Sequence, residues 1–448
     1  MELAIKIFQF ILSISILVIL HELGHFLPAK YFKTKVEKFY LFFDPYFSLV
    51  KKKIGETEYG IGWLPFGGYV KIAGMVDESM DTEQLKQPAQ PWEFRAKPAW
   101  QRLIIMLGGV TVNFFLAWII YGCLSFFNGE TSFDTAKVDA PMNYTSVAKG
   151  MGFQDGDKIL KVDGKTQNNL DKLALDVLLS DEITVLRNGK EVTFPTNDDG
   201  KAMAFRDENP RAFLTPRFPA VIDSIYNPKT AQAGLKVGDQ VVAVDGKKIS
   251  YYDEFQETVR NSPGKDLKVD VVRGGAIQPL VLSVSKEGTL GLASYKQLTK
   301  FYETKHFSFG ESIGRGFTRS IESLTYQVKQ FKLIFNKKVQ GYKKVGGPLA
   351  IIKNMPVDKA RDGSVSIDWT AFWSFTAMFS VWLAFLNLIP IPGLDGGHVI
   401  FTLYEMIVGK PVPQKILENA QMVGVIFLLG LMLLIFGADI FKIITNKF

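Results

Sequence analysis

The chain contains very little cysteine and histidine for its 448 residues. Its single cysteine, Cys123, excludes an intrachain disulfide, and the position of Cys123 inside a long apolar run argues against a catalytic thiol. Only four histidines are present, so a site that uses imidazole has few candidates. The basic residues form no stripe interleaved with aromatic residues, and the formal net charge of +7 therefore does not indicate a nucleic-acid-binding protein.

Apolar residues make up 47% of the sequence and are concentrated in long runs. A membrane-spanning helix needs about 20 mostly apolar residues. Four segments meet this requirement: Leu3–Leu27, Leu103–Phe127, Thr370–Pro390 and Met422–Ile444. The first run follows Lys6 as in a signal peptide, but it lacks a small-x-small cleavage site. We therefore expect an α-helical membrane protein with four spanning helices, the first of them uncleaved.

The distribution of lysine predicts the orientation of these helices. Residues 28–102 carry an excess of lysine, which is typical of a cytoplasmic loop. Segment 128–369 and both termini are then expected outside, and the 391–421 connection inside. The run Lys51–Lys53 could contact anionic lipid or lie in a solvated turn.

Two segments outside the apolar runs show regular patterns. Glu58–Val70 has period-two features interrupted by glycines, which predicts strands with tight bends, either as a hairpin against the membrane or as a small cytoplasmic sheet. Residues 308–340 have apolar side chains at helical spacing, which predicts an amphipathic helix. This helix could lie on the membrane surface or pack on a neighbouring external domain.

The external segment contains an internal repeat. Gly152–Gly164 and Gly234–Gly246 share a glycine turn, a Gly-Asp pair before an apolar strand, and an Asp-Gly turn, all at matching positions. Both copies resemble PDZ domains. We therefore divide the chain into an N-terminal membrane part (1–127), two PDZ domains (131–210 and 211–292), a connector (293–369) and a C-terminal membrane part (370–448).

The strongest chemical signal is His21-Glu22-Leu23-Gly24-His25 in the first apolar run. Residues four apart share one face of a helix, so His21 and His25 can present two imidazole nitrogens to one metal ion. Glu22 then becomes a candidate general base. Ionisable residues inside a spanning helix are costly and are retained mainly for function.

A catalytic zinc site needs a third protein ligand from elsewhere in the chain. The segment Asn387–Gly397 is expected at the same membrane depth as the two histidines, and Pro390 and Pro392 should break its helix around a wet cavity. Asp395 and His398 are both candidates within or beside this segment. His306 belongs to the external segment and is a weaker candidate.

Three motifs in this order resemble the site-2 protease family. They are the HExxH motif at His21–His25, the stretch Leu64–Lys71, and the Asn-x-x-Pro-x-Pro-x-Leu-Asp-Gly element at Asn387–Gly396. The proline of the family's Gly-Pro-x-x-Asn element is absent from Gly108–Asn113, so Asn113 could line the site or make a polar contact between helices.

The resemblance implies a zinc endopeptidase with Asp395 as the third ligand and Glu22 as the base. It also implies that residues 54–72 form a membrane-associated β-hairpin that pairs with an unwound substrate strand. The residues expected to contact the substrate are Asn387, Pro390, Pro392, Asn113 and Tyr69.

By the same resemblance, the substrates are single-span membrane proteins already shortened on their external side, such as an anti-sigma factor after a first cleavage, or remnant signal peptides. The expected location is a bacterial inner membrane, with the PDZ domains in the periplasm and the site near the cytoplasmic side. A metal transporter and a membrane-anchored PDZ scaffold are the competing hypotheses. A transporter needs neither Glu22, placed as a base between two ligands, nor external peptide-binding domains. The intact HExxH and Asp395 elements argue against a scaffold with a degenerate enzyme.

Overall fold

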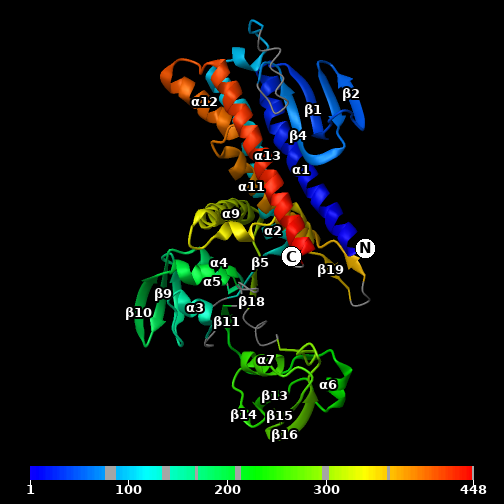
Figure 1. The fold of residues 1–448 in the computed structure, drawn as a ribbon, viewed down its shortest axis with the longest axis vertical. Coiled ribbons are helices and arrows are strands. Elements are labelled where there is room, and N and C mark those ends of the chain that lie inside the picture. The colour runs from blue at the N-terminus through cyan, green and yellow to red at the C-terminus, as the bar shows by residue number, and fades with distance from the viewer. Residues whose placement is uncertain are drawn as a thin grey trace. The chain divides into compact units, whose positions relative to one another are not determined.

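The computed structural model describes residues 1–75, 87–133, 142–166, 170–206, 213–294, 302–360 and 364–445. The chain forms two compact units. The membrane unit consists of Met1–Gly129, His306–Lys329 and Val345–Phe448, and the repeat unit consists of Glu130–Lys305 and Gln330–Lys344. Each unit is described by itself (Figure 1).

Four helices of the membrane unit are long and apolar enough to cross a membrane: α1 (Glu2–Tyr31), α2 (Ala99–Asn128), α11 (Trp369–Leu388) and α13 (Gln414–Ile444). The prediction of four spanning helices is therefore confirmed. Helix α2 packs against both α1 and α11. Gly24 and Gly108 allow the first contact to be close, because a Cβ on either residue would overlap the backbone of the opposite helix.

The connection between α11 and α13 contains a helix that we did not predict, α12 (Asp395–Val408). Helix α11 ends at Leu388, where Pro390 cannot continue it, and the chain turns through Gly393 at φ 99° before α12 begins. Several apolar side chains of α12, including Ile400, Leu403 and Ile407, are exposed. The segment that we expected to be a cytoplasmic connection thus contains a partly apolar helix that packs against α2.

A four-stranded sheet follows α1, with strand order β2-β3-β1-β4. Its strands are β1 (Val36–Phe43), β2 (Val50–Ile54), β3 (Thr57–Ile61) and β4 (Leu64–Ile72). The expected strands with tight bends are present, but the expected pairing within residues 54–72 is wrong. Strands β2 and β3 form the hairpin, whereas β4 pairs with β1, which lies between β3 and β4. The sequence of β1 lacks strict alternation, and its central place in the sheet was therefore missed.

The predicted amphipathic helix is confirmed as α9 (Phe309–Phe335). A Cβ at Gly316 would overlap the backbone of Trp118 and Gly122 in α2, so the two helices are in close contact there. The apolar stripe of α9 is exposed in part even though Phe309 and Phe317 contact aromatic rings of α2. Its exposed members are Phe309, Ile313, Phe317, Ile321 and Val328. An exposed apolar stripe on a helix that packs against a spanning helix favours the membrane-surface interpretation.

A short segment of the membrane unit that begins at residue 345 packs against the spanning helices α1 and α13. It contains α10 (Pro348–Lys353), β19 (Asp358–Lys359) and β20 (Val365–Ser366), whereas η4 (Gly341–Lys344) belongs to the repeat unit. The buried carboxylate of Asp439 in α13 accepts hydrogen bonds from the backbone N–H groups of Gly347 at 2.9 Å and Leu349 at 3.1 Å. Asp439 thus satisfies N–H groups at the start of α10 that would otherwise lack partners.

The repeat unit contains two copies of one fold, framed by the paired strands β5 (Glu130–Phe133) and β18 (Tyr302–Lys305). Their elements follow the same order, except that helix α5 of the first copy has no counterpart in the second. The first copy comprises β6 (Met142–Tyr144), α3 (Ser146–Gly150), β7 (Lys158–Val162), β8 (Lys165–Thr166), α4 (Leu170–Leu179), β9 (Glu182–Arg187), β10 (Lys190–Pro195), α5 (Asp198–Arg206) and β11 (Leu214–Pro216). The second comprises β12 (Ser224–Ile225), α6 (Pro228–Gln232), β13 (Gln240–Val244), β14 (Lys247–Lys248), α7 (Tyr252–Arg260), β15 (Asp266–Arg273), β16 (Ala276–Ser283) and β17 (Leu292–Ala293).

The pairing of strands is equivalent in the two copies. The four-stranded sheets have the orders β10-β9-β7-β8 and β14-β13-β15-β16, and each has a register shift at the same repeat position. Strand β11 pairs with β6, so the first copy extends beyond our expected limit at residue 210. That limit itself lies outside the described residues.

Each copy contains an arginine–aspartate ion pair at the same position of the repeat. Arg187 donates to Asp157 at 2.8 and 2.7 Å and to the carbonyl oxygen of Gly152 at 3.0 Å. Arg273 donates to Asp239 at 2.7 and 2.5 Å and to the carbonyl oxygen of Gly234 at 2.7 Å. Both aspartate side chains are at most 1% exposed. A buried carboxylate paired in this way depends on its arginine.

We expect the stability of the second copy to decrease only at low pH. Burial alone would raise the pKa of Asp239, but the hydrogen bonds from Arg273 and from the Lys236 backbone lower it overall. A carboxyl group whose pKa is lowered by folding adds stability above its unfolded pKa of about 3.9, and this stability is lost as pH falls through the folded pKa. We expect amide hydrogen exchange in β13 and β15, corrected for intrinsic rates, to be constant from about pH 7 to 5 and faster below about pH 4.

Asp239→Asn provides the control for this prediction. The variant should be less stable at neutral pH and should lose most of the acid response in β13 and β15. An acid response of unchanged size in the variant would show that another group is responsible.

Candidate metal centre

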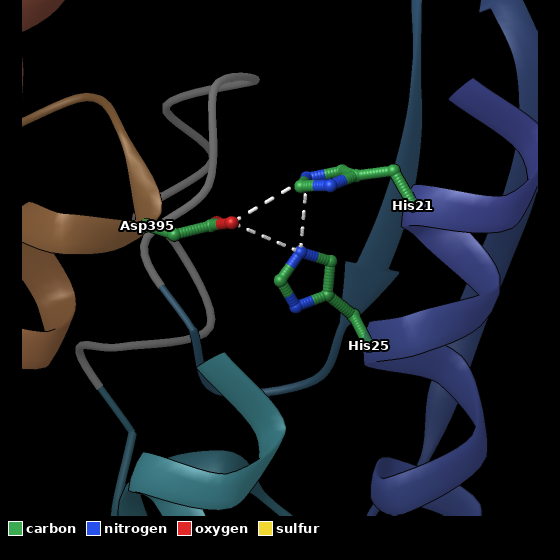
Figure 2. Close-up of side chains that lie close together, drawn as sticks. All are labelled: His21, His25 and Asp395. Atoms are coloured by element: carbon green, nitrogen blue, oxygen red, sulfur yellow. Dashed lines mark hydrogen bonds and ion pairs between the residues drawn. The ribbon is translucent and has the colours of Figure 1, made fainter. Parts of the chain in front are cut away.

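Two imidazole rings on successive turns of α1 point toward one carboxylate at the start of α12, as Figure 2 shows. The Nε2 atoms of His21 and His25 are 3.3 Å apart. Asp395 Oδ2 lies 3.4 Å from His21 Nε2 and 3.3 Å from His25 Nε2. The structure therefore brings together His21, His25 and Asp395, the three side chains that we expected to bind the metal.

The local sequence holds Asp395 at this position. Asp395 is the first residue of α12, where the helix dipole favours a negative charge. The turn before it is fixed by α13, because Gln421 Oε1 accepts a hydrogen bond from the backbone N–H of Gly393 at 3.2 Å. A Cβ at Gly424 would overlap the carbonyl group of Pro392, so α13 contacts the turn directly.

The three donor atoms fit a zinc ion in both chemistry and environment. Two imidazole nitrogens and one carboxylate oxygen are a common ligand set for catalytic zinc. The side chains of His21, His25 and Asp395 are 12%, 5% and 16% exposed. Among the described residues, the buried Asp395 Oδ2 accepts no hydrogen bond. A buried carboxylate oxygen without such a partner is expected where a cation would satisfy it.

Hydrogen bonds behind the imidazole rings determine which nitrogen faces the centre. His25 Nδ1 lies 2.8 Å from the carbonyl oxygen of Ile105 and must donate to it, which leaves the lone pair of Nε2 for a metal. His21 Nδ1 lies 3.1 Å from the amide nitrogen of Asn113, whose own Oδ1 is buried and has no hydrogen-bond partner in the described part of the chain. Exchanging the amide atoms of Asn113 lets His21 Nδ1–H donate to Oδ1 and satisfies both groups.

The three side chains open into a cavity of about 700 Å³. Glu22, Asn387, Tyr69 and His398 also line it, and Asn387 Nδ2 lies 3.3 Å from His21 Nε2. Asn113, which we expected to contact the substrate, is completely buried behind His21 and does not line the cavity. Pro390 and Pro392 do not line it either, but they form the turn that leads to Asp395.

Strand β4 forms the wall of the cavity next to Glu22. The Glu22 carboxylate accepts a hydrogen bond from the backbone N–H of Val70. Gly68 allows this approach, because a Cβ there would lie 2.6 Å from Val18 Cγ1 and 3.7 Å from Glu22 Cγ. Among the described strands, β4 pairs only with β1, so its second edge has no strand partner.

Gly109 is a part of the centre that sequence reasoning missed. A Cβ at this position of α2 would lie 2.6 Å from His21 Cε1 and 2.8 Å from His21 Nδ1, and closer still to His25 Nε2. The only signal in the sequence was the pair Gly108-Gly109 four residues before Asn113.

Gly109→Ala should therefore displace both imidazole rings and weaken zinc binding. Residues that only orient a metal ligand typically contribute about 10–100-fold in affinity, and we expect a loss in this range. Zinc retained by the purified protein during competition with a chelator measures the effect. Gly430→Ala in α13 is the matched control, because its Cβ would meet no atom within 4 Å. Equal zinc retention in the two variants would contradict this account of Gly109.

The sequence was compared with known protein families and curated proteins. The model of peptidase family M50 matches residues 9–431. A Neisseria meningitidis protein that carries the name of a zinc metalloprotease is 28% identical over 98% of both chains. The regulator of sigma-E protease RseP of Escherichia coli is 28% identical over 95% of this chain and 96% of its own length.

These matches span nearly the whole chain and confirm the resemblance inferred from the three motifs. They also confirm zinc as the cofactor, in agreement with the donor atoms of His21, His25 and Asp395. The chain is a zinc metalloprotease of the membrane, and it belongs to peptidase family M50.

Proposed function

We propose that the chain is an intramembrane endopeptidase that cleaves the transmembrane segments of single-span proteins already shortened on their external side. The composition of the cavity is the main support for this proposal. The cavity combines the His21, His25 and Asp395 side chains with Glu22 and an unpaired strand edge, and it lies among helices apolar enough to span a membrane. Such a cavity can admit an extended peptide and a water molecule together.

In this proposal His21, His25 and Asp395 hold the zinc ion, and Glu22 is the general base. When bound, zinc would lower the pKa of a water molecule and polarise the scissile carbonyl. Glu22 accepts the proton of the attacking water and delivers it to the nitrogen of the leaving amine. Asn113 and Ile105 hold the two imidazole rings in the required tautomers through their hydrogen bonds to Nδ1.

A helical substrate must unwind before cleavage, because its carbonyl groups are held in hydrogen bonds within the helix. The free edge of β4 offers backbone groups that can pair with the unwound segment as an additional strand. Tyr69 in β4 and Asn387 at the end of α11 line the same cavity and are proposed to contact that segment. Pro390 and Pro392 contribute by shaping the adjoining turn.

We propose an anti-sigma factor, after a first cleavage, as the type of substrate, in a regulated proteolytic response to stress. Support comes from the E. coli relative, which is named a regulator of sigma-E protease. Remnant signal peptides would fit the same cavity. The two repeat copies are proposed to be PDZ domains that act as a size filter, with capture of free C-termini as the alternative.

The proposed location is a bacterial inner membrane. The lysines of residues 28–102 favour a cytoplasmic position for the loop between α1 and α2. Both termini and the repeat unit would then be periplasmic, and the metal centre would lie toward the cytoplasmic side, because His21 and His25 are in the C-terminal half of α1.

A pair of substrates with the same transmembrane segment tests this proposal. In vesicles, the protein should cleave the substrate whose external domain has been removed and leave the intact one uncut. Amidation of the new external C-terminus should not change the rate if the repeat unit only filters by size. It should slow cleavage if free C-termini are captured. Equal cleavage of intact and shortened substrates would contradict the requirement for prior shortening.

A further inference from the structure

The loops at one end of the four-stranded sheet carry an exposed apolar cluster, which we name the apolar tip. It consists of Tyr46, Phe47, Leu49, Val50 and Trp63, and all five side chains are exposed. The cluster is ordered by specific contacts. Trp63 Nε1 donates to the carbonyl oxygen of Pro45 at 3.0 Å, and the rings of Trp63 and Phe47 stack with centroids 5.8 Å apart.

The contacts of the sheet with α1 place the apolar tip at membrane depth. Phe39 in β1 packs on Phe26 with ring centroids 5.4 Å apart, whereas Gly68, the partner of Leu41, lies against Val18 and Glu22. Strand β1 therefore runs back along α1, away from the helix end at Tyr31 (Figure 1). The loops that follow β1 and β3 lie further along in this direction, beside the middle of a spanning helix. In a membrane, exposed apolar side chains beside the middle of a spanning helix would meet acyl chains and not water.

Strand β2 returns from the apolar tip and carries Lys51, Lys52 and Lys53. All three are exposed, and none forms an ion pair with another described residue. The register of β2 with β3, and of β3 with β1, places Lys51 level with Tyr40 and Lys53 level with Lys38. The lysines thus lie between the apolar tip and the sheet end nearest Tyr31, where their long side chains can extend toward the lipid headgroups.

We propose that the apolar tip and Lys51–Lys53 form a binding surface for anionic phospholipid. The tip inserts among the acyl chains, and the three ammonium groups bind headgroup phosphates of the same leaflet. No described carboxylate forms an ion pair with the three lysines. Positive charge next to inserted apolar side chains favours binding to an anionic membrane.

The other occupant to consider for β2 is a substrate strand, because β2 is also an edge of the sheet. Three consecutive lysines on an edge strand oppose strand addition. The free edge of β4 lies in the cavity beside Glu22 and has no such barrier. The two edges therefore have different partners: lipid at β2 and peptide at β4.

Lipid-selective fluorescence quenching tests this inference without measuring proteolysis. The full-length protein with Cys123→Ser has no other cysteine, so Tyr46→Cys in this background accepts a single fluorescent label. The labelled protein is reconstituted in phosphatidylcholine vesicles that contain a fixed fraction of either brominated phosphatidylglycerol or brominated phosphatidylcholine. Juxtamembrane lysines favour anionic lipid by roughly fivefold each at low salt, so brominated phosphatidylglycerol should quench severalfold more strongly.

Two further comparisons assign the effect to the lysines. High salt and the triple change Lys51→Gln, Lys52→Gln and Lys53→Gln should each make the two brominated lipids equivalent, while quenching itself persists. The same number of changes at exposed lysines of the repeat unit, Lys247→Gln, Lys248→Gln and Lys265→Gln, should leave the selectivity intact. Equal quenching by both lipids in the unaltered lysine background would overturn the proposal. Quenching that is absent, or that disappears when substrate is added, would also overturn it, and the second result would assign β2 to the substrate.

Discussion

Glu22→Gln is expected to retain zinc and to lose proteolytic activity. The change removes the carboxylate but leaves the donor atoms of His21, His25 and Asp395 in place. The amide of glutamine cannot accept a proton from water, so the loss should match the contribution of a general base, about 100- to 10,000-fold in kcat. The hydrogen bond from the Val70 backbone can still be accepted by the amide oxygen, and the packing of α1 on β4 should persist.

The measurement is the rate of substrate cleavage in vesicles, together with the zinc content of the same preparations. Glu257→Gln, at an exposed position of α7, removes a carboxylate of the same type far from the metal centre in sequence and should behave as the unmodified protein. A Glu22→Gln variant that cleaves at full rate would remove Glu22 from the mechanism. A variant that loses zinc together with activity would leave the role of Glu22 as base unsupported.

Asp395→Asn is expected to lose most of its bound zinc. A neutral amide is a poor zinc ligand compared with a carboxylate, and Asp395 is the only carboxylate among the three donor groups. The decrease in affinity should exceed the roughly 10–100-fold typical of residues that only orient a ligand. Zinc retention during titration with a chelator gives the size of the effect, and circular dichroism checks that the helices remain folded.

His398→Asn is the matched control for Asp395→Asn. His398 is three residues away on α12 and lines the same cavity, and it was the main rival as third ligand on sequence grounds. The structure leaves it outside the group of donor atoms within 4.8 Å of one another. Retention of zinc by His398→Asn supports Asp395 as the ligand. Loss of zinc from His398→Asn, with retention by Asp395→Asn, would reverse the two assignments.

The local part of the metal centre could be predicted from sequence because it depends on one helix. His21 and His25 are four residues apart in an apolar run, so helix geometry alone brings them together. The remote donor was harder. Sequence placed Asp395 at a suitable depth, but only the family resemblance chose it over His398. The turn that positions Asp395 depends on Gln421 and on the small size of Gly424 in α13, and neither dependence has a local signal.

The pattern of apolar residues identified the spanning helices, but it could not determine how the strands pair. Strands β3 and β4 are adjacent in sequence, and a hairpin was the simplest expectation. In the structure β1 lies between them. Both β1 and β4 pack against α1, so the order of the strands depends on contacts between residues far apart in sequence. The repeat showed a similar limit. The two glycine-rich motifs were evident, whereas Arg187 and Arg273 lie far enough from Asp157 and Asp239 in sequence that their pairing was not apparent.

The central claim is that the His21, His25 and Asp395 group supports peptide hydrolysis within a membrane. Its most direct test maps the cut in a shortened single-span substrate by mass spectrometry, with purified protein in vesicles. We predict a cut inside the apolar segment that stops when a chelator removes zinc, resumes when zinc is restored, and is absent with Glu22→Gln. A zinc-loaded protein that leaves the substrate whole, or cuts it only outside the apolar segment, would contradict the account.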